Sequence, residues 1–480
     1  MSFQELRSRL AAGQHVFLTG SAGTGKSYLT REWLTICQKE TLVTATTGVA
    51  ALNLPDGMTL HSVLRLPVNR YPGLVEWVRE SLVTRTAPRT MTAVRRVKEA
   101  RYLLLDEVSM TPAYLWELAD LRCRVWREVP GQPFGGLTVL CVGDFLQLPP
   151  VYRAEADPTP HPRCGLYAFE SPMWQAMNFY TLNLQVVHRQ QHAGFAELCG
   201  HLRHGQPLTP GEAIMLRARC VPNTNPQALQ VMVRRQEVNR VNLQYLQRLP
   251  GPLSTVPFPR ECEGSSDDMK KALVADVRQV LYLEHHDVHQ QWRVGARVML
   301  VANLRLEDTF AYVNGDRGTI LGFVLETTTT TTAALQPAPK HWFPQGQWPV
   351  VQFDRTADRR VLVTYHLWER NVTNREGRPL AYTSLRALPL CLAQAATCHK
   401  VQGATISGPL AIDCTLMSSI PSAFYVALSR ATELENVTLS NFGGPGVCPV
   451  KAEDFYQGRY PVSPDEVAKM QRVFDRISDV

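Results

Sequence analysis

The chain has 480 residues, of which 45% are hydrophobic and 19% are charged, and its formal net charge at pH 7 is +7. A chain of this length and composition buries a substantial core and forms about two to four domains. No apolar run approaches the roughly 18 residues of a membrane span, and the N-terminus lacks the layout of a secretory signal. We therefore expect an intracellular protein with no membrane partner: cytoplasm or nucleoid in a bacterium or phage, nucleus or mitochondrion in a eukaryote.

Cysteine usage excludes two further classes. Eleven cysteines are spread from Cys37 to Cys448, and none forms a CxxC pair. This odd, unpaired set is typical of neither a disulfide framework nor a zinc site. We expect the cysteines to be buried as small apolar side chains.

The first half of the chain alternates strand-like apolar runs with helix-like segments, the pattern of a parallel sheet covered by helices. The expected strands are residues 15–20, 41–45, 101–108 and 137–144. The expected helices follow Lys26, Thr47 and Pro112. This order predicts an α/β nucleotide-binding domain.

A glycine-rich loop follows the first expected strand and opens a helix. Its residues are Gly20, Ser21, Ala22, Gly23, Thr24, Gly25, Lys26 and Ser27. In such a loop, glycines let backbone N–H groups curl around phosphates, and the helix N-terminus favours negative charge. We expect Lys26 to reach the β and γ phosphates of ATP and Ser27 to coordinate Mg²⁺. The alternative is a plain glycine turn.

Basic residues gather between the second and third expected strands. Residues 65–101 hold nine Lys or Arg against the acids Glu76, Glu80 and Glu99, which gives the stretch a charge of +6. Such a patch attracts nucleic-acid phosphates. The alternative is an ordinary solvated face.

Two adjacent carboxylates, Asp106 and Glu107, end the apolar strand at 101–108. Consecutive side chains of an extended strand point in opposite directions, so the two should have different roles. We assign Asp106 to Mg²⁺ and Glu107 to the activation of the attacking water.

A polar Gln147 follows the strand at 137–144 and precedes two prolines. Ligands of open α/β sheets bind at the carboxyl ends of the strands, so Gln147 is a candidate γ-phosphate sensor. The alternative is a simple turn.

A second series of alternating strands and helices is expected later in the chain, and a segment of short strands interrupts it. Strands are expected at 228–233, 409–415 and 437–442, and helices at 236–247 and 421–432. Between them, residues 291–388 show short strands and an Asn314-Gly315 turn, which predict a small β-barrel. Threonines at 327–332 indicate a surface loop, and a capping box at 463–466 predicts a C-terminal amphipathic helix that packs on the body.

Taken together, these motifs resemble the petite-integration-frequency (PIF) helicases of the RecD-like branch of superfamily I. Residues 44–51 and 59–62 look like motif Ia and its neighbour, and 188–190, 396–405 and 425–431 look like motifs IV, V and VI. Residues 133–136 are similar to a segment that separates this family from other RecD-like enzymes, and 295–300 with 313–318 match the family's inserted barrel.

The resemblance implies an α/β fold with two tandem RecA-like domains of the phosphate-loop NTPase class. Domain 1A would comprise residues 1–64 and 100–190, and domain 2A residues 191–290 and 389–450. The insertions would be a small basic wedge, 1B, at 65–99 and the β-barrel, 2B, at 291–388. A helical tail would follow at 451–480.

The resemblance also implies residue roles. Gln147, Arg189 and Arg430 would contact the γ-phosphate, and Gln4 would read adenine. The implied contacts to single-stranded DNA are Thr46, Gly48, His61, Ser62, His399, Lys400 and Gln402, and we add Phe145 as an apolar side chain on which bases stack or wedge. This chain departs from the family at Arg234 and Arg235, where a Thr-Asn pair is common, and at Cys398.

The implied function is an ATP- and Mg²⁺-dependent helicase that moves 5′-to-3′ on single-stranded DNA and acts at junctions with duplex. Its expected roles are in replication, repair, recombination or telomere maintenance, and we expect it to work as a monomer. Three alternatives stay open: a translocase that displaces proteins but unwinds poorly, an ATP-gated DNA-binding scaffold, and a phosphate-loop enzyme that does not act on DNA.

Overall fold

The computed structural model describes residues 2–47, 50–51, 54–67, 74–87, 90–150, 167–257, 260–264, 289–302, 304–306, 309–312, 316–324, 348–356, 359–373 and 379–443. Contacts between Cα atoms divide the chain into two compact units, Met1–Asn225 with Val401–Val480, and Pro226–Lys400. None of the described helices has the length and apolarity of a membrane span. Gly48, the 314–315 turn, the Thr-rich loop at 327–332 and the helix predicted from Ser463 lie outside the described residues.

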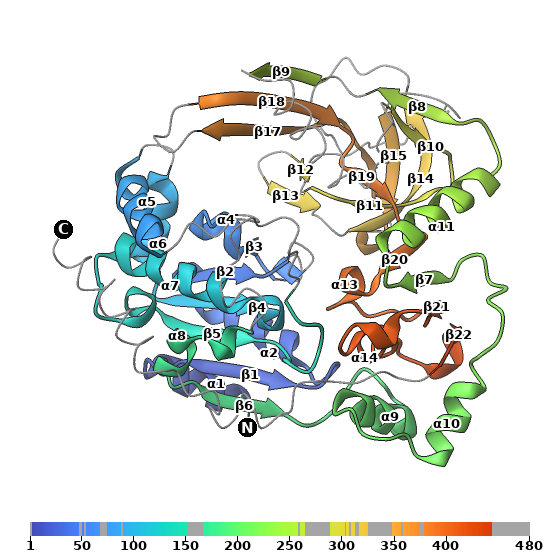
Figure 1. The fold of residues 1–480 in the computed structure, drawn as a ribbon, viewed down its shortest axis with the longest axis horizontal. Coiled ribbons are helices and arrows are strands. Elements are labelled where there is room, and N and C mark those ends of the chain that lie inside the picture. Colours follow the sequence, from blue (N-terminus) through green and yellow to red (C-terminus); the bar gives the residue numbers. More distant parts are fainter. Residues whose placement is uncertain are drawn as a thin grey trace. The chain divides into compact units, whose positions relative to one another are not determined.

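A six-stranded parallel sheet forms the centre of the first unit (Figure 1), in the order β3-β2-β4-β5-β1-β6. Its strands are β1 (Val16–Gly20), β2 (Thr41–Ala45), β3 (Met58–Thr59), β4 (Tyr102–Asp106), β5 (Thr138–Val142) and β6 (Tyr180–Leu184). The helices around it are α1 (Ser2–Ala11), α2 (Lys26–Cys37), α4 (Leu60–Leu64), α5 (Leu74–Thr86), α6 (Met91–Glu99), α7 (Ala113–Arg127) and α8 (Pro172–Ala176).

Each central strand faces two hydrophobic cores, because successive side chains of a strand point to opposite faces. Leu104 on β4 and Leu140 on β5 join the core beneath α1 and α2, which also contains Trp33. Leu103 and Leu105 join the opposite core, which is built with α4 to α8. A sheet covered on both faces explains why these strands read as continuous apolar runs.

The first unit continues with α9 (Ala193–Arg203) and α10 (Pro210–Arg217), and then with residues after 400. There, β21 (Leu410–Asp413) pairs in parallel with β22 (Val437–Ser440), and α14 (Ala423–Leu428) packs against α9. Thr209 begins α10 with a capping box, since it accepts from Glu212 N while the Glu212 side chain accepts from Thr209 N.

The second unit joins one parallel pair of strands to antiparallel sheets. Strands β7 (Leu229–Met232) and β20 (Ala395–Thr397) pair in parallel and contact α11 (Arg235–Arg248). The largest antiparallel sheet has the order β16-β15-β14-β11-β19, with strands Arg360–Leu362, Trp348–Phe353, Arg317–Val324, Arg297–Leu300 and Leu390–Leu392.

Three smaller antiparallel sheets complete the described part of this unit. Their strands are β8 (Ser254–Pro257) with β10 (His289–Trp292), β12 (Leu304–Leu306) with β13 (Thr309–Tyr312), and β9 (Arg260–Gly264), β17 (His366–Thr373) and β18 (Pro379–Ala387). The short strands predicted for 291–388 are present among the described residues. They form separate sheets, so the β-barrel stays a prediction.

Most predicted strands appear within two residues of their expected bounds, and the strand predicted to reach 108 ends at Asp106. The helix predicted at 421–432 is the shorter Ala423–Leu428. The domain boundaries stay a prediction, because the residues expected to form domain 2A fall in both compact units. Six of the described cysteines are buried as expected, whereas Cys37 is half-buried and Cys220 is exposed.

Candidate nucleotide-binding site

The glycine-rich loop joins β1 to α2 and owes its path to glycines with positive φ. Gly23 and Gly25 have φ of +81° and +89°, in the region that residues with a Cβ rarely adopt. A Cβ on Gly23 would lie 2.5 Å from the Cβ of Arg189. Glycine is therefore required at position 23 for both its backbone angle and this close approach.

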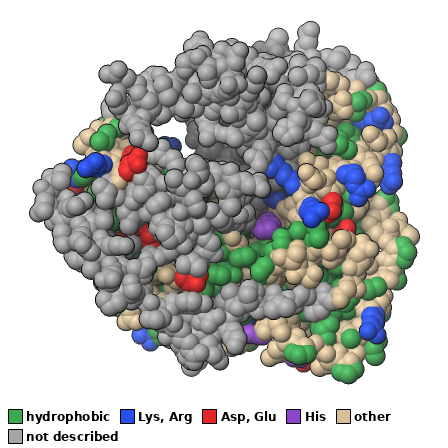
Figure 2. All heavy atoms as spheres, in the orientation of Figure 1, with side chains coloured by type: hydrophobic (Ala, Val, Ile, Leu, Met, Phe, Trp, Pro, Cys, Tyr) green, Lys and Arg blue, Asp and Glu red, His purple; other side chains and the backbone are tan. Residues whose placement is uncertain are grey.

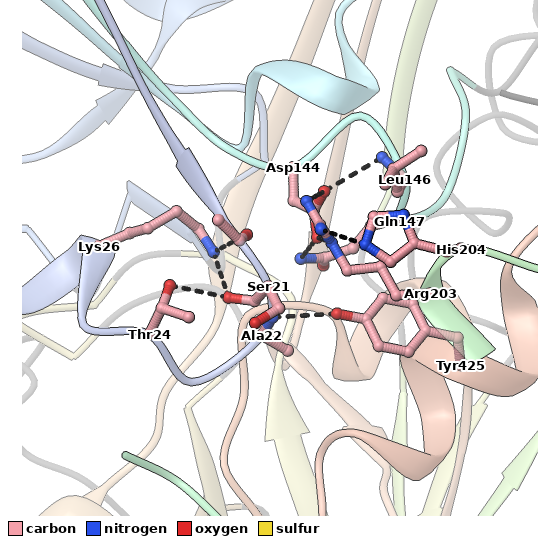
Figure 3. Close-up of polar contacts among 11 residues, drawn as sticks. Ser21, Ala22, Thr24, Lys26, Asp144, Leu146, Gln147, Arg203, His204 and Tyr425 are labelled. Carbon is pink, nitrogen blue, oxygen red and sulfur yellow. Dashed lines mark hydrogen bonds and ion pairs between the residues drawn. The ribbon is translucent and has the colours of Figure 1, made fainter. Parts of the chain in front are cut away.

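Lys26 begins α2 and folds back over the loop (Figure 3). Its Nζ donates hydrogen bonds to the carbonyl oxygens of Gly20 and Ser21, at 2.8 and 2.9 Å. Burial lowers the pKa of Lys26 to about 8, against the opposing effect of the Asp144 and Glu107 carboxylates. An anion placed beside this ammonium would stabilise its charged form.

Asp106 is the last residue of β4, with only 6% of its surface exposed. Its Oδ1 accepts a hydrogen bond from the backbone N–H of Glu107 at 2.9 Å. Burial and the neighbouring Glu107 charge raise the pKa of Asp106 to about 7. A carboxylate in this position is stabilised by a cation, and together with the Ser27 hydroxyl it offers the oxygen ligands that Mg²⁺ prefers.

Glu107 leaves the strand at once, with a left-handed φ of +53° that is uncommon for a residue with a side chain. Asp106 and Glu107 thus occupy different positions because the chain turns between them. The predicted cause, alternation along a continuous strand, is wrong. Glu107 Oε2 accepts a hydrogen bond from Gln402 Nε2 at 3.0 Å.

A buried ion pair follows β5 (Figure 3). Asp144 accepts from Arg203 Nη2 at 2.9 Å and from Arg203 Nε at 3.0 Å, and Asp144 Oδ2 also accepts from Gln147 Nε2 at 3.3 Å. Burial alone would raise the pKa of Asp144, but the Arg203 charge and hydrogen bonds outweigh it and lower the pKa. Gln147 is 4% exposed, and its Oε1 has no hydrogen-bond partner among the described residues.

The segment at 188–190 lies directly against the glycine-rich loop. His188 N donates to Gly23 O at 2.8 Å. Arg189 Nη1 donates to Ser429 O at 2.9 Å, and Gln190 Nε2 donates to Ala431 O at 2.9 Å. Burial and the nearby Arg430 charge lower the pKa of Arg189 to about 9.

Residues on and after α14 complete the site. The Tyr425 hydroxyl accepts a hydrogen bond from the loop's Ala22 N at 3.0 Å (Figure 3), and burial raises the pKa of Tyr425. Arg430 is 2% exposed, donates from Nε to Val426 O at 2.9 Å, and has its pKa lowered by burial. The structure thus gathers Lys26, Arg189 and Arg430, as the sequence predicted.

The residues predicted to contact DNA lie in both compact units. In the first unit, Thr46 Oγ1 donates to Glu107 O at 2.9 Å, and Ser62 N donates to Thr59 Oγ1 at 3.2 Å at the start of α4. Burial lowers the pKa of His61 and of His399. His399 and Lys400 belong to the second unit, in the short helix α13 (Cys398–Val401).

Two of the predicted DNA contacts need correction. Phe145 is fully buried, with ring centroids 4.8 Å from Phe169 and 5.2 Å from Phe17, so it is a core residue with no face for a base. Gln402 is only 5% exposed and directs its amide to Glu107. The Gln402 amide therefore lies beside Glu107 and Ser109.

Gln4, the predicted adenine reader, is exposed on α1. It lines a depression of about 700 Å³ together with Glu5, Ser8, Arg9, Ala12 and Gln14. No contact between Gln4 and the glycine-rich loop appears among the described residues, so its role in adenine binding stays a prediction.

Acidic side chains in the fold compensate more of the positive charge of residues 65–101 than the sequence indicates. Glu128, which lies outside it, pairs with both Arg85 and Lys98, at 3.1 and 3.0 Å. Glu99 pairs with Arg95 at 3.6 Å. Charge counted along a segment therefore overstates the free positive charge on the surface.

Sequence reasoning did not assign a role to Arg203, Tyr425 or Gln190. Tyr425 and Gln190 belong to segments that the motifs already marked, so a polar residue in the same motif as each predicted arginine was the available signal. Arg203 lies in a helix without a motif. Only the fold brings it to Asp144.

The chain is similar to known proteins over most of its length. A family model described as PIF1-like helicase matches residues 5–201. The chain is 30% identical over 477 residues to the ATP-dependent DNA helicase PIF7 of Trypanosoma brucei brucei, and this match covers 92% of the chain and 46% of the relative. It is 31% identical to the ATP-dependent DNA helicase PIF1 of Rattus norvegicus, covering 93% of the chain and 62% of the relative. The chain thus spans about half to three fifths of these relatives' lengths.

A solved structure agrees over nearly the full chain. The crystal structure of Pif1 helicase from Candida albicans superposes with a TM-score of 0.74 at 25% identity. The match covers 95% of this chain and 97% of the other. The two chains therefore share a fold.

Proposed function

We propose that this chain, whose sequence and fold are similar to those of PIF1-like helicases, is an ATP-driven DNA helicase that moves 5′-to-3′ along single-stranded DNA. The observation that carries the proposal is the set of three buried cations around the glycine-rich loop. Burial lowers the pKa values of Lys26, Arg189 and Arg430. Such groups favour a polyanion between them, as the triphosphate of ATP supplies.

The side chains divide the hydrolysis between them. Lys26 binds the β and γ phosphates, and Glu107 accepts the proton of the water whose oxygen attacks the γ-phosphorus as the bond to the bridging oxygen breaks. Gln147, with its unpartnered Oε1 among the described residues, orients the γ-phosphate and water. Arg189 and Arg430 stabilise the charge on the transferring phosphoryl group.

Ser27 and Asp106 would hold Mg²⁺, which neutralises charge on the β and γ phosphates when bound. The raised pKa of Asp106 fits this role, because a buried carboxylate without a cation favours its protonated form. Ser27 lies in the first turn of α2, next to Lys26.

Single-stranded DNA is the proposed track, and the cell interior the proposed location. Thr46, Gly48, His61, Ser62, His399 and Lys400 are the proposed contacts, of which Gly48 lies outside the described residues. Hydroxyl and backbone N–H donors suit phosphate contacts, which do not depend on base sequence. The relatives' names, ATP-dependent DNA helicase, support this substrate.

Unwinding of duplexes with only a 5′ tail or only a 3′ tail tests the proposal, with Lys26→Ala as the blank. We expect ATP-dependent unwinding of the 5′-tailed duplex and loss of hydrolysis by at least about a hundredfold in the variant. Preference for the 3′ tail would exclude the proposed polarity. DNA-stimulated hydrolysis without unwinding would indicate a translocase that displaces proteins instead.

A further inference from the structure

Glu107 is held from two sides by segments whose sequences resemble DNA-contacting motifs. On one side, Gln402 Nε2 donates to Glu107 Oε2 at 3.0 Å. On the other, Thr46 Oγ1 donates to Glu107 O at 2.9 Å, and Thr46 N donates to Asp106 O at 3.1 Å. The carboxylate and the backbone of one residue are thus fixed by two different parts of the chain.

The contact between Gln402 and Glu107 is built into the fold. Gln402 is 95% buried, since its exposed fraction is 5%. Its Nε2 also lies 3.4 Å from Ser109 Oγ, while its Oε1 has no partner among the described residues. Burying an unpartnered amide oxygen is unfavourable, so this arrangement persists because other interactions require it.

The next residue, Gly403, lets the backbone come close to the same carboxylate. Its φ is +80°, and a Cβ at this position would lie 3.2 Å from Glu107 Oε1. Glu107 itself adopts an unfavourable left-handed φ of +53°. Strain of this kind at a functional residue is maintained by surrounding contacts, and those contacts come from Thr46 and Gln402.

A glutamate side chain has several rotatable bonds, and general-base catalysis needs its oxygen within hydrogen-bond reach of the attacking water. A fixed amide donor on Oε2 restricts those rotations. We propose that Gln402 is a positioning residue that orients the Glu107 carboxylate for ATP hydrolysis, an inference that rests on the proposed function.

Two substitutions at position 402 test this role. Gln402→Ala removes the amide, and Gln402→Met keeps a similar length but has no N–H to donate. We expect both to lower kcat of DNA-stimulated ATP hydrolysis about 10- to 100-fold, which is within the range that a general base contributes. We expect KM for ATP, and Kd for a single-stranded oligonucleotide followed by fluorescence anisotropy, to change less than about threefold because neither ligand loses a contact.

Gln38→Ala is the matched control. Gln38 Nε2 donates to the carboxylate of Asp56 at 2.6 Å on the exposed surface, so the control removes the same kind of hydrogen bond away from the site. We expect it to hydrolyse ATP like the wild-type protein. Thr46→Val and Thr46→Ser add a second comparison. We expect Thr46→Val, which loses the hydroxyl, to have a lower kcat than Thr46→Ser, which keeps it.

Two results would overturn the inference. Wild-type kcat in Gln402→Met would show that the side chain only fills space. A raised Kd for DNA with wild-type kcat at saturating DNA would make Gln402 a DNA contact, as its motif indicates. If the Gln402 variants do not fold, equal kcat values in Thr46→Val and Thr46→Ser would contradict the inference that contacts from both Thr46 and Gln402 position Glu107. If the wild-type protein hydrolyses ATP but does not unwind duplex DNA, the proposed helicase function is wrong and the inference about Gln402 is unaffected. The variants are compared only by their rates of ATP hydrolysis.

Discussion

At the scale of single residues, the site depends on polar groups that support the loop and do not themselves meet the phosphates. The Tyr425 hydroxyl accepts the N–H of Ala22, and Arg203 neutralises Asp144 beside Gln147. Each contact gives a buried polar group a hydrogen-bond partner. Burying such a group without a partner would be unfavourable. These contacts therefore help to hold the loop in its observed geometry.

Tyr425→Phe removes one oxygen and leaves the Ala22 N–H without its partner. An unsatisfied buried donor costs about 1–3 kcal/mol. Part of this cost will appear as weaker ATP binding, so we expect KM for ATP to rise about 3- to 10-fold while kcat at saturating ATP changes little. Steady-state hydrolysis in the presence of single-stranded DNA measures both values.

Tyr28→Phe is the control for this change, since Tyr28 follows Ser27 but is 69% exposed. We expect its KM to match the wild-type value. An unchanged KM in Tyr425→Phe would show that the loop holds its shape without the tyrosine.

The sequence predicts those residues whose role follows from a local pattern. Lys26 and Asp106 are recognised because a glycine-rich loop and an apolar strand directly precede them. Tyr425 and Ala22 are separated by 403 positions, and Arg203 and Asp144 by 59, so no local pattern joins them. Phe145 shows the opposite error: an aromatic residue next to a motif is buried in the aromatic core behind it.

At the scale of elements, apolar periodicity predicts the central strands well, because burial on both faces makes each strand a continuous apolar run. The strand ends are less predictable, since the turn at Glu107 depends on contacts from distant segments. The helices of the predicted 1B wedge are packed by an interaction that apolar periodicity in the sequence does not reveal. Arg122 on α7 is fully buried, with its guanidinium 3.8 Å from the centroid of the Trp77 ring on α5.

Arg122 also joins α5 through polar contacts, to Glu80 Oε1 at 3.3 Å and Thr84 Oγ1 at 2.5 Å. Arg122→Ala removes a buried ion pair, a cation–π contact and a large buried side chain. We expect the free energy of unfolding to fall by about 2–4 kcal/mol, at the lower end of values for buried pairs because Glu80 is partly exposed. Denaturant unfolding followed by tryptophan fluorescence measures the change.

Arg95→Ala provides the comparison, because Arg95 forms an exposed pair with Glu99 within α6. Pairs of this kind contribute about 0.5 kcal/mol or less. Equal losses in the two variants would show that burial of Arg122 adds nothing to the attachment of α5.

At the scale of the whole molecule, charge cannot be assigned from a segment of sequence. The net charge of +6 on residues 65–101 is reduced in the fold by Glu128 and by Glu40, which lies 3.9 Å from Arg101. On the face drawn in Figure 2, the described lysine and arginine side chains form several separate patches. Domain boundaries likewise cannot be assigned from a segment of sequence, because the compact units depend on contacts between segments far apart in the chain.

If the basic stretch contacts DNA, its uncompensated arginines should carry most of the salt dependence. Arg79 and Arg96 are exposed, and neither has an acidic partner among the described residues, whereas Arg85 and Lys98 share Glu128. Each phosphate contact contributes about 0.7 to the slope of log K against log salt for single strands. We expect Arg79→Gln with Arg96→Gln to reduce the slope by about 1.4.

The matched pair, Arg85→Gln with Lys98→Gln, should change the slope less, because Glu128 already neutralises part of that charge and is released when its partners are removed. Both double variants remove two positive charges, so a general effect of net charge would lower both slopes equally. No change in either would place the stretch on a solvated face, away from the DNA. A larger change in the first pair would instead show that the fold selects which cations reach the phosphates.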